Sequence, residues 1–292
     1  ILMISHSSGN ISTEEAAEIV EGLKQGIKIQ GITIYPGVAY RHLLVWDNGP
    51  ENAVTIPPHD VLDQNMAPYL NQSSDNPVPG LIRDSWLILD RHPTNDNRRH
   101  SGMKEANSIW LWGQGKAPQL PLFMDRYGLR GGVISAVDLI KGIGIYSGFI
   151  PIHVEGATGY LDTNYSGKAE AALKGLESLD IIFLHVEAPD EAGHSGNYRE
   201  KVRAIEDFDE KVVGAVIEGL KDFDDYRIMV VSDHFTPLVK RTHTSEPSPF
   251  AWACKKEIES ASDGPPFTEE SAQESGLIFE KGHELLESFL FS

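Results

Sequence analysis

Two hydrophobic stretches of the sequence end in side chains that commonly bind metal ions. Asp190 and His194 come shortly after an apolar run that begins at Ile181, and Asp233 and His234 come directly after another such run. Carboxylates and neutral imidazoles are ligands that divalent cations of the zinc and manganese type accept in proteins. The sequence therefore predicts metal chemistry at the ends of two strands.

A further imidazole, His243, lies in a loop rich in Thr, Ser and Pro, "RTHTSEPSPF". Two aspartates and three histidines are too many ligands for one tetrahedral ion, so the set favours a two-metal site in which each ion keeps an open position. Such sites stabilise the entering and leaving oxygens of a transferring phosphoryl group. The alternative is that each aspartate caps a helix and each histidine only forms hydrogen bonds.

The segment that carries these residues alternates between short apolar runs and longer helical patterns. Apolar runs without alternation are typical of strands buried on both faces, which predicts a mostly parallel sheet between helix layers. In such sheets the functional groups collect beyond the carboxyl ends of the strands. The expected strands are 131–136, 180–187 and 226–234, and the expected helices are 137–148, 167–179 and 197–220. The last helix is expected to bury one face formed by Val202, Ile205, Val212, Val213 and Val216.

The N-terminal part has a different pattern of predicted helices, strands and loops. Ser12 and Glu15 form a capping-box pattern, and a helical spacing of apolar residues follows at Ala16, Ile19, Val20 and Leu23. Two short strands are expected over 28–38 and 42–47, then a loop-rich stretch, and a helix over 80–93 that ends at its proline. Arg98 and Arg99 are expected in a solvated turn. The pattern predicts a small α+β domain over residues 1–100 and a metal-binding core over 101–292.

Composition restricts the class of protein. The formal charge of −18 argues against nucleic acid as a partner, since phosphate-backbone affinity needs clustered Lys and Arg. It does not exclude a small anionic substrate, because a few arginines and bound cations can reverse the field inside one cleft. The single cysteine, Cys254, cannot form an internal disulfide, and neither a signal peptide nor a long apolar run is present. We expect a cytoplasmic protein without membrane contact and leave its oligomeric state open.

Several motifs together resemble one family. The stretches "VEAPDEAGHSGNYREKVRAIEDFDEKVVG", "VVSDHFTP", "RTHTSEPSPFAWA", "ANSIWLWGQGKAPQLP" and "GATGYLDTNYSGKAEAAL" resemble the archaeal-type cofactor-independent phosphoglycerate mutases of the alkaline phosphatase superfamily. The similarity covers essentially the whole chain. It implies an alkaline-phosphatase-like α/β core with an inserted α+β cap domain, two metals, and interconversion of 3-phosphoglycerate and 2-phosphoglycerate through a phosphoserine.

The resemblance also assigns ligands. It implies that Asp190, His194 and His243 bind one metal and that Asp233 and His234 bind the other. Manganese or magnesium is the expected ion, with zinc and cobalt as alternatives. The family's nucleophilic serine and one further aspartate ligand belong to an N-terminal segment that this sequence does not contain, so no catalytic nucleophile is assigned here. The chain by itself is therefore expected to be inactive.

A small phosphorylated metabolite is the expected ligand of the remaining candidates. The resemblance places phosphate and carboxylate contacts in the cap domain, and a core lysine completes the set. These residues are Arg41, His42, His59, Asp60 and Lys141. Two alternatives stay open at this point: a homoserine kinase-like phosphotransferase with the same metal-binding residues, and a non-catalytic remnant that binds phosphorylated metabolites or a partner chain.

Overall fold

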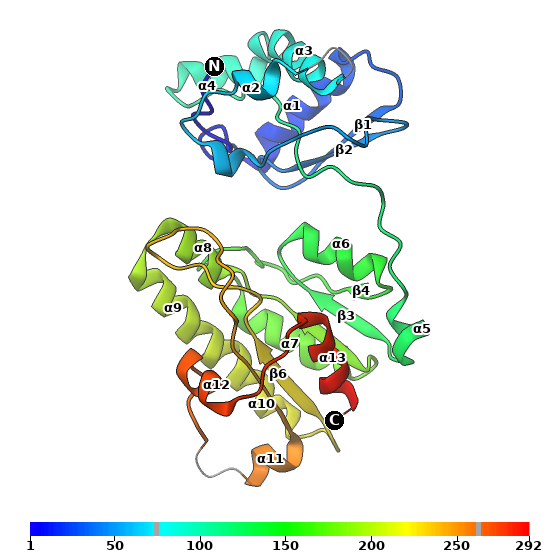
Figure 1. Cartoon of the computed structure of the whole chain (residues 1–292), viewed down its shortest axis with the longest axis vertical. Helices are drawn as coiled ribbons and strands as arrows, with labels where there is room; N and C mark the ends of the chain where they lie inside the picture. The colour runs from blue at the N-terminus through cyan, green and yellow to red at the C-terminus, as the bar shows by residue number, and fades with distance from the viewer. Residues whose placement is uncertain (73–75, 261–263, 292) are drawn as a thin grey trace. The chain divides into compact units, whose positions relative to one another are not determined.

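The chain folds into two compact units. The computed structural model describes residues 1–72, 76–260 and 264–291. The first unit is Ile1–Pro118 and the second is Gln119–Ser292 (Figure 1).

The first unit combines helices with one β-hairpin, in which β1 and β2 pair antiparallel and Ile34 lies opposite Leu44. Its elements are α1 (Thr13–Gly26), β1 (Ile32–Pro36), β2 (His42–Trp46), the 3-10 turn η1 (Pro58–Val61), α2 (Ala67–Leu70), α3 (Val78–Asp90) and α4 (Pro93–His100). The expected α+β character of this part is therefore present.

The second unit alternates strands and helices before it ends in three helices. Its first elements are α5 (Phe123–Tyr127), β3 (Gly131–Ile134), α6 (Asp138–Tyr146), β4 (Ile150–Pro151), α7 (Tyr165–Leu176), β5 (Ile181–Leu184) and α8 (Ala188–Ser195). They are followed by α9 (Tyr198–Phe208), η2 (Asp209–Gly214), α10 (Ala215–Leu220), β6 (Arg227–Val231), β7 (Phe250–Cys254), α11 (Lys255–Ser260), α12 (Glu269–Ser275) and α13 (Gly282–Phe291).

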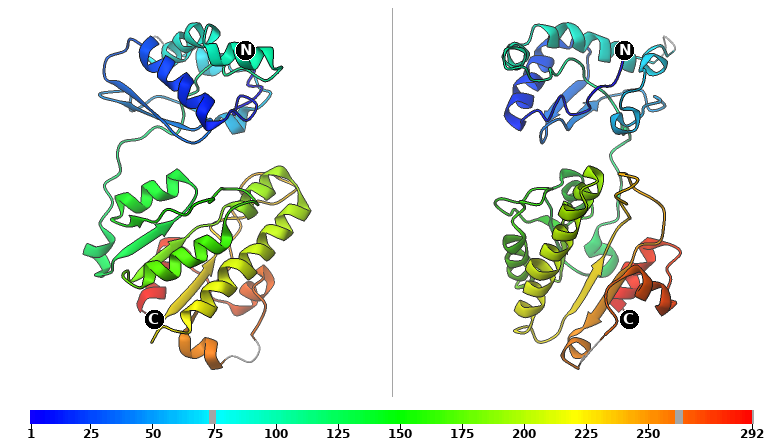
Figure 2. Two further views of the ribbon diagram at one scale, coloured as in Figure 1. Left: turned by 180° about the vertical axis from the view of Figure 1, so that it is seen from behind. Right: turned by 90° about the vertical axis from the view of Figure 1, so that its left-hand side faces the viewer.

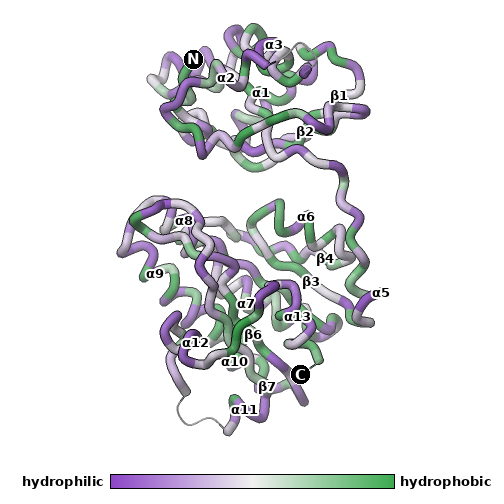
Figure 3. The backbone as a smooth tube through the Cα atoms, viewed as in Figure 1, coloured by the Kyte–Doolittle hydropathy of each residue, from purple (hydrophilic) through white to green (hydrophobic). Residues whose placement is uncertain are grey.

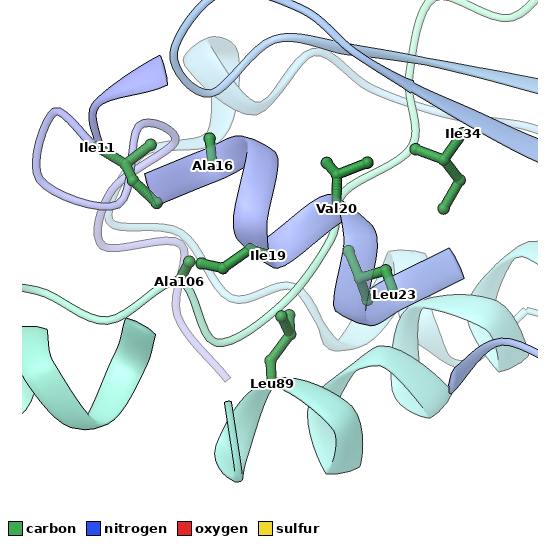
Figure 4. Packing of buried hydrophobic residues seen from close by; sticks show 8 residues of the cluster. All are labelled: Ile11, Ala16, Ile19, Val20, Leu23, Ile34, Leu89 and Ala106. Atoms are coloured by element: carbon green, nitrogen blue, oxygen red, sulfur yellow. The ribbon is translucent and has the colours of Figure 1, made fainter. Parts of the chain in front are cut away.

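Helix α1 organises the core of the first unit. The capping box is confirmed, because the Ser12 hydroxyl accepts from the Glu15 backbone N–H and the Glu15 carboxylate accepts from the Ser12 backbone N–H, both at 3.2 Å. The four apolar positions expected on its inner face are all buried. Figure 4 shows Ile19 lying toward Ala106 and Leu89, both buried residues of the same cluster. Local capping and packing therefore agree on where this helix begins and which face it buries.

Arg98 corrects the expectation of a solvated turn. It lies in α4, its side chain is 1% exposed, and its guanidinium donates to the Glu15 carboxylate at 2.5 Å. Two backbone carbonyls complete its environment, those of Lys104 at 2.7 Å and Ser8 at 2.6 Å. Arg99, the next residue, is surface exposed and pairs with carboxylates there. A fully buried guanidinium is compatible with folding only because its donors are paired in this way.

The segment after α4 belongs to the first unit, so the change of unit falls after Pro118 and not after residue 100. Asn95 is buried and bonds the backbone of Ala106 in both directions, at 2.9 Å each. The indole N–H of Trp110 donates to the Ile56 carbonyl at 2.9 Å. These contacts attach the segment to the first unit, and the role of this unit as an inserted cap stays a prediction.

A parallel sheet lies in the second unit. Its strand order is β4-β3-β5, and both neighbours of β3 run parallel to it, with Val133 opposite Pro151 and Phe183. Strand β3 is buried along its whole length, as expected for a strand covered on both faces. Figure 2 shows α7, α9 and α10 together on one side of the strands.

Strand β6 pairs antiparallel with β7 and makes a separate two-stranded sheet. In Figure 2 the helices α9 and α10 lie on one side of this pair and α12 and α13 on the other. The expectation of complete burial is wrong for β5 and β6, since Phe183 is 43% and Val231 52% exposed. Both belong to edge strands of their sheets, which neighbours cover less completely.

The long helix expected over 197–220 is present but changes its winding in the middle. It consists of α9, the π-helical segment η2 and α10 in direct succession. Ile205 is 51% exposed and Val202 41%, whereas Ala204 and Val212 are buried, so the expected apolar face is wrong in its first half. A π-helical turn adds a residue to the helix, which brings Val212 onto the face of Ala204 and away from that of Ile205.

Apolar residues are distributed over short elements of both units. Figure 3 shows green, hydrophobic stretches along α6 and β6. Among the helices in the described ranges, none has the length and hydrophobicity that crossing a membrane requires.

Candidate metal centre

The five expected ligands lie beyond the carboxyl ends of β5 and β6. After β5 the chain turns into α8, where Asp190 and His194 are four positions apart and therefore lie on the same side of the helix. After β6 come Asp233 and His234, and a further loop carries His243. An antiparallel bridge between Phe235 and Thr244 connects that loop to the β6 end. Two strand ends and one loop are thus brought together.

Four of these side chains form one cluster. The Nε2 atoms of His194 and His243 are 3.1 Å apart, and the Nε2 atom of His194 is 3.3 Å from the Asp190 carboxylate. His243 Nε2 is 3.5 Å from the other carboxylate oxygen of Asp190. The rings of His234 and His243 have centroids 3.8 Å apart. The Asp190 carboxylate therefore contacts two of the three imidazoles, and the third imidazole packs on the ring of His243.

The surroundings of His194 and His243 favour the protonation states in which an imidazole can bind a metal. His194 Nδ1 lies 3.0 Å from the Arg241 carbonyl, which can only accept, so Nδ1 is the donor in this bond, and in a neutral imidazole Nε2 is then the nitrogen with the lone pair. Burial lowers the pKa of His243, and the neighbouring His234 lowers it further, while Asp190 opposes both effects. The neutral imidazole, which is the form that binds metals, is thereby favoured.

The chemistry of the donors fits a divalent ion. Asp190, His234 and His243 each offer one ligand atom, and these atoms all lie within 4.8 Å of one another. Three donors around a common space leave room for an open coordination position. His194 borders this set through the contacts given above.

Asp233 stands apart from the three-donor set. Its side chain is 77% exposed, with Oδ2 3.5 Å from His234 Nε2 and Oδ1 accepting the His234 backbone N–H at 3.0 Å. The structure brings Asp233 beside His234 without drawing it into the group around Asp190. Its role as a ligand of a second metal stays a prediction.

Two of the expected substrate residues of the first unit, Arg41 and His59, lie beside an aromatic ring. The Arg41 guanidinium lies over the Tyr40 ring, 4.8 Å from its centroid, and the hydroxyl of Tyr40 is 3.5 Å from His59 Nε2. The ring of His6 lies 4.5 Å from that of His59. Sequence reasoning missed His6, whose buried Nδ1 atom has no hydrogen-bond partner within the described residues.

The other three expected substrate contacts have different local surroundings. His42 Nδ1 accepts from the Gly37 backbone N–H at 3.2 Å, which places this ring across the β1–β2 turn. Asp60 is exposed in η1. Lys141, in α6 of the second unit, pairs with Asp138 at 2.9 Å. Substrate binding by these residues stays a prediction.

Two residues near the cluster, Thr236 and His185, were missed from the sequence. Thr236 is buried, its hydroxyl hydrogen-bonds the Asp190 carboxylate, and its carbonyl accepts from Lys201 at 2.7 Å. His185, at the end of β5, shares a 3.1 Å hydrogen bond with Ser135 at the end of β3. Thr236 stands two residues after His234, so its closeness in sequence to a candidate ligand was the available signal.

Lys168 was missed as well, although the sequence contained a signal for it. Together with Tyr165, Ala169 and Ala172 it follows the helical spacing of the buried face of α7. Its side chain is 1% exposed, and its Nζ donates to the His185 carbonyl at 3.2 Å. Burial lowers the pKa of Lys168 to about 8, an effect that Glu187 opposes. A buried amine thus supports the turn that leads from β5 into α8.

We predict that Lys168 makes stability increase with pH. Its pKa falls from 10.5 when unfolded to about 8 when folded, so between these values the unfolded chain binds the extra proton. The free energy of unfolding should therefore rise by about 3 kcal/mol as pH increases through this window. Below it, both states are protonated and the cost of burying the charge is fully present.

Denaturant titrations at several pH values measure this slope. Lys168→Met should flatten it, whereas Lys174→Met, which changes an exposed lysine of the same helix, should leave it as in the parent chain. Equal slopes in the two variants would contradict the prediction.

The chain is similar to known proteins over nearly its whole length. A family model described as the metalloenzyme superfamily matches residues 12–286. A protein of Geobacter sulfurreducens, named a probable 2,3-bisphosphoglycerate-independent phosphoglycerate mutase, is 46% identical over 291 residues, which are 99% of this chain and 73% of that protein. A 2,3-bisphosphoglycerate-independent phosphoglycerate mutase of Methanothrix thermoacetophila is 45% identical over 98% of this chain and 72% of its own length.

A solved structure supports the same fold. A protein from Pyrococcus horikoshii superposes with a TM-score of 0.66 at 24% identity, covering 86% of this chain and 62% of that one. The expected alkaline-phosphatase-like α/β fold is confirmed. The chain spans about three quarters of the length of the two mutases that it matches. It belongs to the metalloenzyme superfamily and, within it, to the family of 2,3-bisphosphoglycerate-independent phosphoglycerate mutases.

Proposed function

We propose that this chain takes part in the interconversion of 3-phosphoglycerate and 2-phosphoglycerate, as an isomerase of glycolysis located in the cytoplasm. The observation that carries the proposal is the convergence of Asp190, His234 and His243 within 4.8 Å. Family membership supports the substrate, because the relatives are named for this reaction.

The residues of the cluster would hold the ions that the superfamily requires. Asp190, His194 and His243 are the proposed ligands of one divalent ion, and Asp233 and His234 of a second, with manganese or magnesium as the natural metal. Bound divalent ions supply charge neutralisation for a transferring phosphoryl group. The donor atoms of Asp190, His234 and His243 already lie close together in the protein alone. The site would therefore be arranged before the substrate binds.

The substrate itself is a small anion. In a chain of net charge −18, its attraction must come from a few local cations. We assign this role to Arg41 and Lys141, with His42, His59 and Asp60 as polar contacts. Arg41 can give two parallel hydrogen bonds to a carboxylate or a phosphate.

The test is an assay of the full-length gene product with 3-phosphoglycerate, with the product identified by phosphorus NMR. We expect 2-phosphoglycerate to form, chelation to stop the reaction, and manganese or magnesium to restore it. Phosphorylation of homoserine by a nucleoside triphosphate, without mutase activity, would contradict the proposal and favour a kinase. Metal analysis of the same sample identifies the ion.

A further inference from the structure

The hydroxyl of Thr236 lies between two candidate metal ligands that come from different elements. Thr236 is 3% exposed. Its Oγ1 hydrogen-bonds the Asp190 carboxylate on α8, and it lies 3.3 Å from Nδ1 of His234, which follows β6. One side chain therefore connects the ligands of two separate strand ends.

The direction of these two hydrogen bonds follows from the number of protons. A hydroxyl carries one hydrogen, and an ionised carboxylate can only accept, so Thr236 donates to Asp190. Its oxygen then accepts, and the second bond requires a proton on His234 Nδ1. In the neutral imidazole the other nitrogen, Nε2, then keeps its lone pair. The hydrogen bond to Thr236 thus favours the tautomer of His234 in which Nε2 can bind a metal, against the Asp233 carboxylate, which lies 3.5 Å from Nε2.

The backbone of Thr236 is itself fixed from two helices. Lys201 of α9 donates from Nζ to the Thr236 carbonyl at 2.7 Å. Gly193 of α8 packs so closely that a Cβ atom there would come within 2.6 Å of the same carbonyl oxygen. The close packing of Gly193 and the hydrogen bond from Lys201 therefore hold Thr236 in place.

The loop of His243 is tied to the same segment. Thr244 donates its backbone N–H to the Phe235 carbonyl at 3.1 Å, one residue before Thr236. Displacement of the segment 234–236 would therefore move His234 and His243 together relative to Asp190.

We propose that Thr236, held by Lys201, is a positioning residue that fixes the Asp190 carboxylate and the His234 tautomer for metal binding. This inference rests on the proposed metal site. Outer partners of this kind commonly change metal affinity by about 10- to 100-fold.

The first experiment needs no metal. Nitrogen-15 NMR of the full chain with labelled histidine reports which ring nitrogen of His234 is protonated, at about pH 8.5 where an ordinary histidine is neutral. The parent chain and Thr236→Ser, which retains the hydroxyl, should show the proton on Nδ1. Thr236→Val, which has nearly the same shape but no hydroxyl, should shift it toward Nε2.

The second experiment measures manganese affinity by calorimetric titration of the same proteins. Thr236→Val should bind about 10- to 100-fold more weakly than the parent, and Thr236→Ser within about threefold of it. Lys201→Met should weaken binding by a smaller factor, since it loosens the backbone and leaves the hydroxyl in place. Melting curves of the metal-free proteins exclude a general folding defect.

The two readouts separate the inference from the proposed function. If the parent chain does not bind manganese but Thr236→Val changes the tautomer, the metal assignment fails and the positioning of His234 stands. A proton on Nε2 in the parent chain would overturn the inference without any variant, even if Thr236→Val did not fold. Unchanged tautomer and affinity in Thr236→Val would overturn it as well.

Discussion

Replacement of Asp190 with asparagine should weaken manganese binding by at least about 100-fold, because it removes the carboxylate that contacts His194 and His243 and lies within 4.8 Å of the donor atom of His234. Asparagine keeps a carbonyl oxygen that can still accept from Thr236, so the surroundings of residue 190 should be preserved. Titration of the metal-free chain with manganese, followed by calorimetry or electron paramagnetic resonance, measures the loss.

The control for this variant is Asp222→Asn, which removes one negative charge from an exposed position after α10. It should bind manganese like the parent chain, and both variants should melt at nearly the parent temperature without metal. If Asp190→Asn bound as tightly as Asp222→Asn, the proposed ligand set would be incorrect.

Arg98→Met should destabilise the first unit by about 3–5 kcal/mol, because it removes a buried guanidinium that donates to three acceptors, and each acceptor that loses its donor costs about 1–3 kcal/mol. The loss comes mainly from the carbonyls of Ser8 and Lys104, which lose the donors that replace water in the folded unit. Glu15 is 28% exposed and keeps its bond to the Ser12 backbone, so it suffers less. Circular dichroism melting should show the transition of this unit lowered by more than about 10 °C.

Arg99→Met is the matched control, since it changes the next residue of α4. Arg99 pairs with Asp96 and Glu105 at the surface, and exposed pairs of this kind contribute little to stability. A melting midpoint close to that of the parent is expected. Equal decreases in melting temperature for the two variants would show that the buried contacts of Arg98 contribute no more to stability than the exposed contacts of Arg99.

Local sequence patterns determined much of the fold. Helix α1 could be predicted because its capping box and its apolar face depend on residues within 14 positions of one another. Strand β3 and the carboxyl ends of β5 and β6 could be located in the same way, from apolar runs followed by polar turns. The apolar face of α9 could not, because the π-helical turn in η2 changes the phase of the helix and leaves no periodic signal.

The candidate metal site, too, could be predicted from the sequence only in part. The sequence by itself determined which side chains are ligand types and that they follow two strand ends, since residue type and spacing are local properties. Only the tertiary structure decided that His243 meets Asp190, that Thr236 lies between Asp190 and His234, and that Arg98 is buried against Glu15. Thr236 and Asp190 are 46 positions apart in the sequence, and Arg98 and Glu15 are 83 apart. Only the packing of different elements brings such distant residues within hydrogen-bond distance.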